Sequence, residues 1–144
     1  MKINNNTANR WGGAICLRQD SNQSTTLYMR GGEISGNKAA QEGGAVHVLD
    51  KGCQFFLYDG KITGNTSVDG GAIYLNQEPS VLNMTGGEIS GNTATGNGGG
   101  AGIGGGWDCS ASDISITGGN VTAVGKQDDP GRIGGAGIGG GLDA

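Results

Sequence analysis

The chain has 144 residues, a length that suits one domain, and 33 of them are glycine while 2 are proline. Its 9 basic and 13 acidic side chains give a net charge of −4, and no run of Lys or Arg marks a surface for nucleic acid. No apolar stretch has the roughly 18 residues that a membrane-spanning helix needs, and the polar start MKINNNTANR has no hydrophobic core of a signal peptide. We therefore expect neither a nucleic-acid partner nor insertion into a membrane.

In chain order, two short motifs alternate along the sequence. The first motif reads GGEISGN at 31–37, DGKITGN at 59–65 and GGEISGN at 86–92. The second reads GGAI at 12–15, GGAV at 43–46 and GGAI at 70–73, with looser GAGI copies at 100–103 and 135–138. Recurrence at a period of about 20 to 50 residues indicates stacked units that bury their apolar faces only against each other.

Aliphatic residues form three columns when the units are aligned. The first motif supplies Ile3, Ile34, Ile62, Ile89 and Val121. The alternating apolar pairs that precede it begin at Leu27, Phe55, Leu82 and Ile114, and those that follow the glycine corner begin at Ile15, Val46, Ile73, Ile103 and Ile138. Alternation indicates strands with one buried face. The sequence therefore predicts an all-β parallel solenoid, with three short strands per coil and about four to five coils, as a single domain over 1–144.

One polar column accompanies the apolar ones. Three residues after the aliphatic position of the first motif lie Asn6, Asn37, Asn65 and Asn92, and the series ends at Val124. Asparagine tolerates left-handed backbone angles at a corner, and its side-chain amide can hydrogen-bond its counterpart in the next coil. We interpret the column as a structural asparagine ladder, with a ligand-binding role as the alternative.

Outward positions on the strands before the first motif carry an aromatic group. Tyr28, Phe56 and Tyr58 lie there beside Arg30, whereas the later coils have only Asn, Ser and Thr at these places. Aromatic residues on a flat sheet offer a surface for sugar rings or for another protein, and such a group is unusual where 5% of the residues are aromatic. We expect these four residues to bind a ligand, unless loops or a neighbouring domain cover them.

The three cysteines, Cys16, Cys53 and Cys109, give neither paired disulfide spacings nor the four close ligands of a zinc site. Cys53 shares the inward parity of Phe55, which predicts a small buried side chain. Cys16 shares an outward column with His47, and we expect two neighbouring surface residues there. A nucleophile with its base is the alternative. We expect no bound metal and no cofactor.

The paired GGA(I/V) and IxGN motifs resemble the tandem repeats of bacterial surface and autotransporter-type adhesins with a pectin-lyase-like fold, over residues 3 to about 103. The first motif reads ISGN or ITGN where chlamydial polymorphic membrane proteins have FxxN. The resemblance implies a right-handed parallel β-helix at the cell surface or outside the cell. It also implies a structural or adhesive role without catalysis, with a glycan or a host surface protein as partner.

Proteins of pectin-lyase-like fold also include polysaccharide lyases and hydrolases, so such an enzyme is the alternative function. Hydrolysis of a glycosidic bond requires two carboxyl groups held about 5 to 9.5 Å apart. Glu33 and Glu88 occupy equivalent corners with Lys61 between them, which is typical of alternating surface charge, and Asp128 and Asp129 precede Pro130 in a loop. No Gly-His-Gly motif accompanies them. We therefore expect no catalytic residues.

The ends of a solenoid expose unpaired backbone N–H and C=O groups, which can pair with another chain. We therefore also expect end-to-end self-association. The repeat begins and stops in the middle of a unit, without polar end caps, and this predicts that 1–144 is a fragment of a longer surface protein.

Overall fold

The computed structural model of the chain describes residues 1–77, 79–96, 102–105, 113–125 and 137–139, and every regular element within these ranges is a β-strand. None of the described segments is a helix that could cross a bilayer. The strands are β1 Lys2–Asn4, β2 Thr7–Ala8, β3 Ile15–Leu17, β4 Thr26–Ser35, β5 Lys38–Ala39, β6 Val46–Val48, β7 Gln54–Thr63, β8 Thr66–Ser67, β9 Ile73–Leu75, β10 Val81–Met84, β11 Glu88–Ala94, β12 Asp113–Ile116 and β13 Asn120–Val124.

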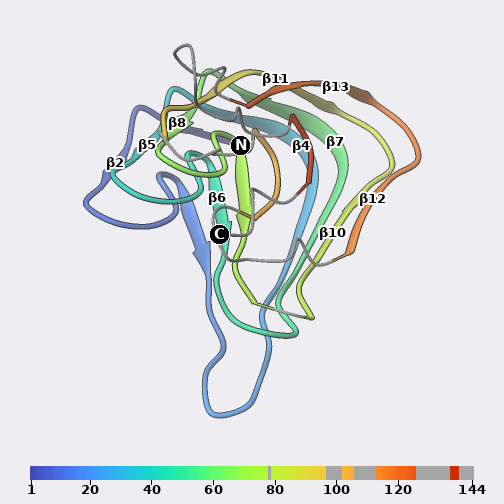
Figure 1. Cartoon of the computed structure of the whole chain (residues 1–144). Coiled ribbons are helices and arrows are strands. Elements are labelled where there is room, and N and C mark those ends of the chain that lie inside the picture. The colour runs from blue at the N-terminus through green and yellow to red at the C-terminus, as the bar shows by residue number, and fades with distance from the viewer. Residues whose placement is uncertain (78, 97–101, 106–112, 126–136, 140–144) are drawn as a thin grey trace.

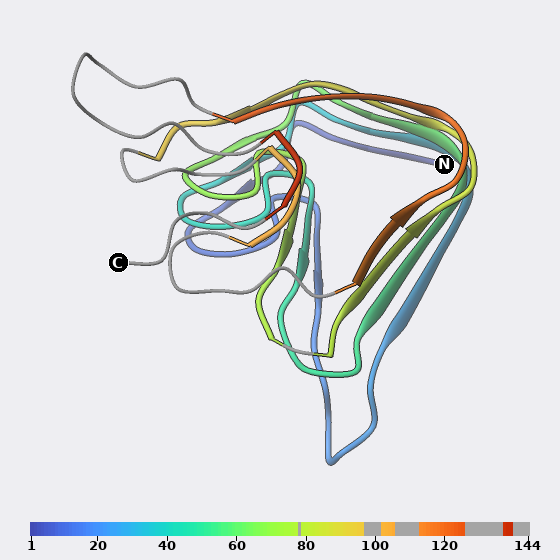
Figure 2. The same cartoon turned by 45° about the vertical axis from the view of Figure 1, so that its right-hand side comes forward.

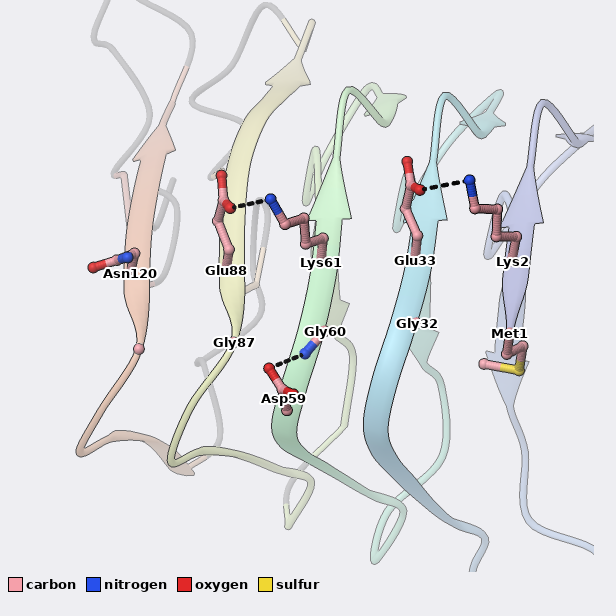
Figure 3. A pocket seen from close by; sticks show the side chains of 11 residues that line it. Met1, Lys2, Gly32, Glu33, Asp59, Gly60, Lys61, Gly87, Glu88 and Asn120 are labelled. Atoms are coloured by element: carbon pink, nitrogen blue, oxygen red, sulfur yellow. Dashed lines mark hydrogen bonds and ion pairs between the residues drawn. The ribbon is translucent and has the colours of Figure 1, made fainter.

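The strands wind as a parallel β-solenoid, as predicted (Figure 1). The larger sheet runs β1-β4-β7-β11-β8-β5-β2, with β10, β12 and β13 paired beside it, and the smaller sheet runs β3-β6-β9. All of these pairs are parallel. Successive coils overlie one another in the turned view (Figure 2). Seen from outside in Figure 3, the strands run upward and each later coil is added on the left, which makes the solenoid right-handed.

The three predicted apolar columns are confirmed residue by residue. Phe55 is the Cα partner of both Leu27 and Leu82, and Leu82 is also the partner of Ile114. The first motif stacks as Ile3, Ile34, Ile62, Ile89 and Val121, and the third column stacks as Ile15, Val46, Ile73, Ile103 and Ile138. Side chains of the central coils are fully buried, and each burial contributes about 1.5–3 kcal/mol. The three columns together therefore form one continuous hydrophobic core inside the coils.

The first two predicted strands of a coil are continuous in β4 and β7. Each of these strands passes from the apolar column of Leu27 and Phe55 to that of Ile34 and Ile62 around a corner that contains glycine. The pairing between the two strands shifts register at this corner. In the next coil the corresponding strands, β10 and β11, are separate. The corner therefore bends the sheet without always ending the strand.

The GGA motif has a steric explanation at both of its glycines. The first glycine, at positions 12, 43 and 70, has a φ of 59°, 68° and 59°, the left-handed region that side chains rarely adopt. At the second glycine, an added Cβ on Gly44 would collide with the carbonyl oxygen of Gly71, and one on Gly71 with the backbone of Thr93. The motif therefore lets the chain turn while adjacent coils remain in close contact.

The asparagine ladder is confirmed, but its backbone differs from the expectation. Asn37 donates from its backbone N and its Nδ2 to Asn65 Oδ1, both over 2.9 Å, and Asn65 donates in the same way to Asn92 Oδ1. The left-handed residue is the one before the ladder position: Asn5, Gly36, Gly64 and Gly91 have φ values from 55° to 63°. The ladder side chains therefore point inward, where Asn37 and Asn65 are buried.

The end of the ladder also differs from the expectation. A register shift within the β11–β13 pair places Ala123, and not Val124, beside Asn92. The β13 segment has alanine and valine where the earlier coils have the Gly-Asn pair, so no side-chain amide continues the ladder there.

Candidate functional site

The residues that we expected to bind a ligand lie together on the outer face of the larger sheet. Tyr28 on β4 is the Cα partner of Phe56 on β7, and Tyr58 follows on the same face. The rings are nearly parallel, with the Tyr28 centroid 5.3 Å from that of Phe56 and 6.4 Å from that of Tyr58. We call Tyr28, Phe56, Tyr58 and Arg30 the aromatic cluster.

Arg30 is held against the rings of this cluster. Its guanidinium carbon lies 5.3 Å from the Tyr28 centroid and 5.4 Å from the Tyr58 centroid. Each such contact contributes about 0.5–1 kcal/mol at an exposed site. In the part of the chain that the structure describes, no carboxylate lies within ion-pair distance of Arg30. The arginine is therefore positioned by aromatic contacts.

The aromatic cluster is exposed to solvent, but the rings cover part of one another's faces. The side chains of Tyr28 and Tyr58 are 52% and 40% exposed, and Phe56 is half-buried. Because the rings stack on one another, part of each face is occupied by its neighbour. Beyond Phe56 the outward column continues with Asn83 and Ser115, so the aromatic surface spans two coils.

A groove lies beside this cluster on the outside of the glycine corner, and sequence reasoning missed it. It has a volume of about 690 Å³, and its lining includes Gly32, Gly60, Gly87 and Gly119. Figure 3 shows the charged side chains along one side of the groove and Asp59 near its middle, where Asp59 Oδ1 accepts a 2.7 Å hydrogen bond from Gly60 N. The repeated glycine before the Glu or Lys of each first motif was the signal that could have predicted this groove.

The charged row along the groove consists of Lys2, Glu33, Lys61 and Glu88, one from each successive coil. The predicted alternation of surface charge is therefore confirmed. Lys2 pairs with Glu33 over 3.6 Å and Lys61 with Glu88 over 3.2 Å (Figure 3).

Both carboxylates of the charged row are held in their ionised form. Hydrogen bonds from the hydroxyls of Ser35 and Ser90 lower the pKa of Glu33 and of Glu88, respectively, and the neighbouring lysines lower the pKa of both further. A general acid in glycoside hydrolysis needs the opposite, a raised pKa. The row is thus suited to charge pairing.

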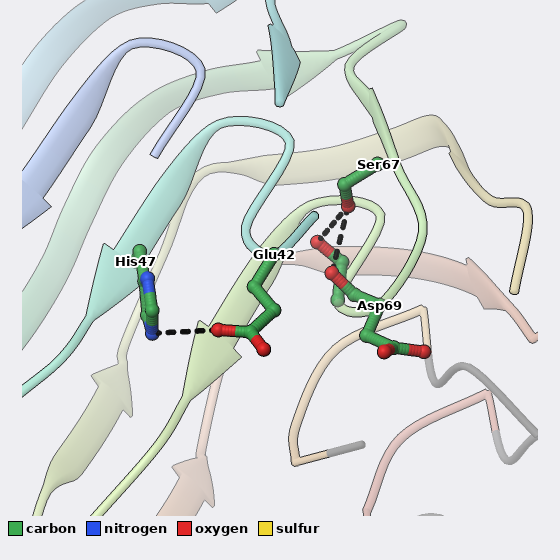
Figure 4. Close-up of polar contacts among 5 residues, drawn as sticks. Glu42, His47, Ser67 and Asp69 are labelled. Atoms are coloured by element: carbon green, nitrogen blue, oxygen red, sulfur yellow. Dashed lines mark hydrogen bonds and ion pairs between the residues drawn. The ribbon is translucent and has the colours of Figure 1, made fainter. Parts of the chain in front are cut away.

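The expected surface pair of Cys16 and His47 is wrong with respect to exposure. The two residues are Cα partners, and Tyr74 continues their column, so the predicted face is confirmed. However, His47 is 0% exposed, with the ring centroids of Trp11 and Tyr74 at 5.9 Å and 5.2 Å. The nearest carboxylate oxygen is Glu42 Oε2, 3.6 Å from His47 Nε2 (Figure 4). An outward side chain is buried here because two stacked turns lie over it, one with Trp11 and the next with Glu42.

Burial sets the protonation states in this region. It lowers the pKa of His47 to about 4, although the charge of Asp50 opposes the shift. Burial raises the pKa of Glu42, with a further contribution from the charge of Asp69, and burial also raises the pKa of Asp69. The pKa of the Cys16 thiol is raised mainly by burial, which keeps it protonated at neutral pH and argues against a nucleophile at this position.

His47→Phe is expected to reduce the loss of stability at acid pH. The unfolded histidine takes up its proton near pH 6.5 and the folded one near pH 4, so the His47 contribution to stability is full above pH 6.5 and falls as the pH is lowered through this window. This loss amounts to about 3 kcal/mol at pH 4. Urea unfolding at pH 7 and pH 4 should show a smaller drop in the free energy of unfolding for the variant than for the natural chain. An equal drop in the free energy of unfolding for both proteins would contradict a lowered pKa of His47.

The remaining candidates give no further site. Cys53 is fully buried, as predicted. Within the described ranges, no three His, Cys, Asp or Glu side chains gather in a way that could hold a metal ion. Asp128, Asp129 and Cys109 lie outside the residues that the structure describes.

Two segments of the chain match the family model of the Chlamydia polymorphic membrane protein repeat, at residues 2–18 and 59–76. Each segment runs from the first motif past a ladder asparagine and the GGA corner to the third apolar column. Isoleucine in place of the phenylalanine of FxxN does not prevent the match. The chain is thus similar to this repeat over two separate stretches that make up less than half of its length. No curated protein and no solved structure gives a significant match.

Proposed function

We propose that this solenoid is a structural and adhesive module of a bacterial cell-surface or secreted protein, and that its aromatic cluster binds a glycan or a host protein. The observation that carries the proposal is the cluster itself: three nearly parallel rings and an arginine on an exposed sheet face. The two matches to a repeat of bacterial surface proteins support the location and the structural role.

The cluster has the properties of a pre-organised binding surface. Tyr28 and Phe56 are fixed by adjacent paired strands, and Arg30 is held over the tyrosine rings. A ligand therefore meets side chains that have already lost most of their rotamer freedom, which lowers the entropic cost of binding. The exposed parts of the rings can pack against the apolar face of a sugar or a peptide, and the tyrosine hydroxyls can hydrogen-bond it.

A polysaccharide lyase or hydrolase remains the second candidate, because a groove with carboxylates adjoins the cluster. The described residues favour binding over catalysis there. Glu33 and Glu88 lie two coils apart with Lys61 between them, and both have a lowered pKa. Neither is therefore suited to donate a proton to a leaving group at neutral pH.

Tyr28→Ala with Phe56→Ala is expected to weaken ligand binding strongly without unfolding the chain. Glycan arrays and immobilised host surface proteins would first identify a ligand, and titration by tyrosine fluorescence would give its Kd. Loss of both rings should weaken binding by about 100-fold, at about tenfold per ring. Ser115→Ala, at an exposed polar position of the same outward column, is the matched control and should leave the Kd unchanged.

Two results would overturn the proposal. One is the absence of any glycan or protein ligand for the natural chain. The other is a ligand whose Kd stays the same in the double variant while the circular dichroism spectrum shows an intact fold. Release of sugar products from a polysaccharide would instead favour the enzyme.

A further inference from the structure

We propose that the charged row is an interface between two copies of this chain. The two rows face each other, and the solenoid axes of the two copies are antiparallel. The interface involves neither the aromatic cluster nor a ligand. The order of charges in the row, their exposure and the groove beside them favour it.

The order of charges is fixed by the strand register. Lys2, Glu33, Lys61 and Glu88 are successive Cα partners on β1, β4, β7 and β11, so their signs read plus, minus, plus, minus along the solenoid. The strands of neighbouring coils are about 4.8 Å apart, so the charges follow one another at that spacing. A regular charge pattern on a rigid sheet can recognise a partner with the complementary pattern.

This row is complementary to itself in one orientation only. A two-fold axis along the strand direction, passing between Glu33 and Lys61, reverses the order in the second copy. Lys2 then faces Glu88 of the other copy, and Glu33 faces Lys61, so all four contacts join opposite charges. A two-fold axis along the solenoid axis would instead place each charge against its own copy and would repel. The charge order therefore selects the antiparallel pair.

The surroundings of the row leave room for a second copy. Four glycines line much of the groove beside it, so no side chain from those positions stands in front of the charges, and Asp59 lies near the middle of the groove (Figure 3). Lys2 and Lys61 are exposed, and the two glutamates are partly exposed. Each charge already has one ion-pair partner within its own chain, and a second copy adds a further charge of opposite sign at each place. Because exposed ion pairs contribute little each and are screened by salt, the pairing should be weak and salt-sensitive.

A charge-swap series tests this interface by sedimentation velocity over a dilution series, at about 0.01 M and about 1 M salt. The natural chain should dimerise at low salt and dissociate at high salt. Lys61→Glu makes the row read plus, minus, minus, minus and places two pairs of like charges in contact, so the association constant should fall at least about tenfold. The double variant E33K/K61E reads plus, plus, minus, minus, which is again self-complementary in the antiparallel orientation, and its dimer should return.

Lys38→Glu is the matched control, because Lys38 is an exposed strand lysine outside the row and the net charge changes by the same amount. It should dimerise like the natural chain. A chain that stays monomeric at both salt concentrations would overturn the proposal. So would association that Lys61→Glu and Lys38→Glu affect equally, because that result points to the open sheet edges instead. Failure of the double variant to restore a dimer that Lys61→Glu had broken would refute the antiparallel register.

Discussion

Asn65→Ala is expected to lower the free energy of unfolding by about 4 kcal/mol. The Asn65 side chain is fully buried and donates to Ile34 O over 3.0 Å and to Asn92 Oδ1 over 2.8 Å, while its own Oδ1 accepts both Asn37 donors. Alanine leaves several of these buried groups without a partner, and each such group costs about 1–3 kcal/mol. Urea unfolding followed by circular dichroism measures the loss.

Asn6→Ala provides the control within the same ladder. Asn6 is exposed, so water can replace its side-chain hydrogen bond to Asn37 Oδ1, and its backbone N still donates to that oxygen over 3.0 Å. This substitution should cost about 1 kcal/mol or less. If Asn65→Ala cost no more than Asn6→Ala, the ladder would not be a buried structural element.

Gly44→Ala is expected to cost at least about 3 kcal/mol, because it forces two adjacent coils apart. An added Cβ on Gly44 would collide with Gly71 O and would lie 2.8 Å from the backbone N of Thr66. These are backbone atoms of the next coil, so no side chain can rotate away to relieve the contact. Neighbouring hydrogen bonds between the coils, such as Gly44 N to Gly70 O at 3.0 Å, would be strained as well. Thermal and urea unfolding measure the effect.

Gly64→Ala separates this clash from the general cost of replacing glycine. Gly64 has a φ of 63°, so alanine there is strained, but the added Cβ would meet only Gly36 N at 3.9 Å. The left-handed conformation alone costs about 1–2 kcal/mol. Gly44→Ala should therefore be the more damaging of the two. The reverse order would show that the coils are not in the close contact described above.

The parts of the fold that the sequence predicted are those that follow from repetition. Period-two alternation assigns Phe55 and Leu82 to the inner face, and the repeat assigns them to the same column, so the register needs no further information. The Asn65 position was predicted for the same reason. The backbone conformation of Asn65 was not predicted. The preceding Gly64 takes the left-handed φ that was expected at the asparagine, and the Asn65 side chain can therefore point inward.

The candidate site was less predictable, because alternation tells which face a side chain points to and not what covers that face. His47 points outward and is nevertheless buried, since the turn before it in its own coil and the stacked turn of the preceding coil lie over it. Tyr28 and Phe56 point outward and stay exposed or half-exposed. The two cases look alike in the sequence. They differ through the length and path of the turns, which the repeat does not encode.

The most direct test of the stacked coils is a nuclear Overhauser experiment on isotope-labelled protein. The stack predicts contacts from the Phe55 ring to the side chains of both Leu27 and Leu82, and from Leu82 to Ile114, although these residues are 27 to 32 positions apart in the chain. Contacts confined to residues close in sequence, with none between these four side chains, would contradict the solenoid and every proposal that depends on it.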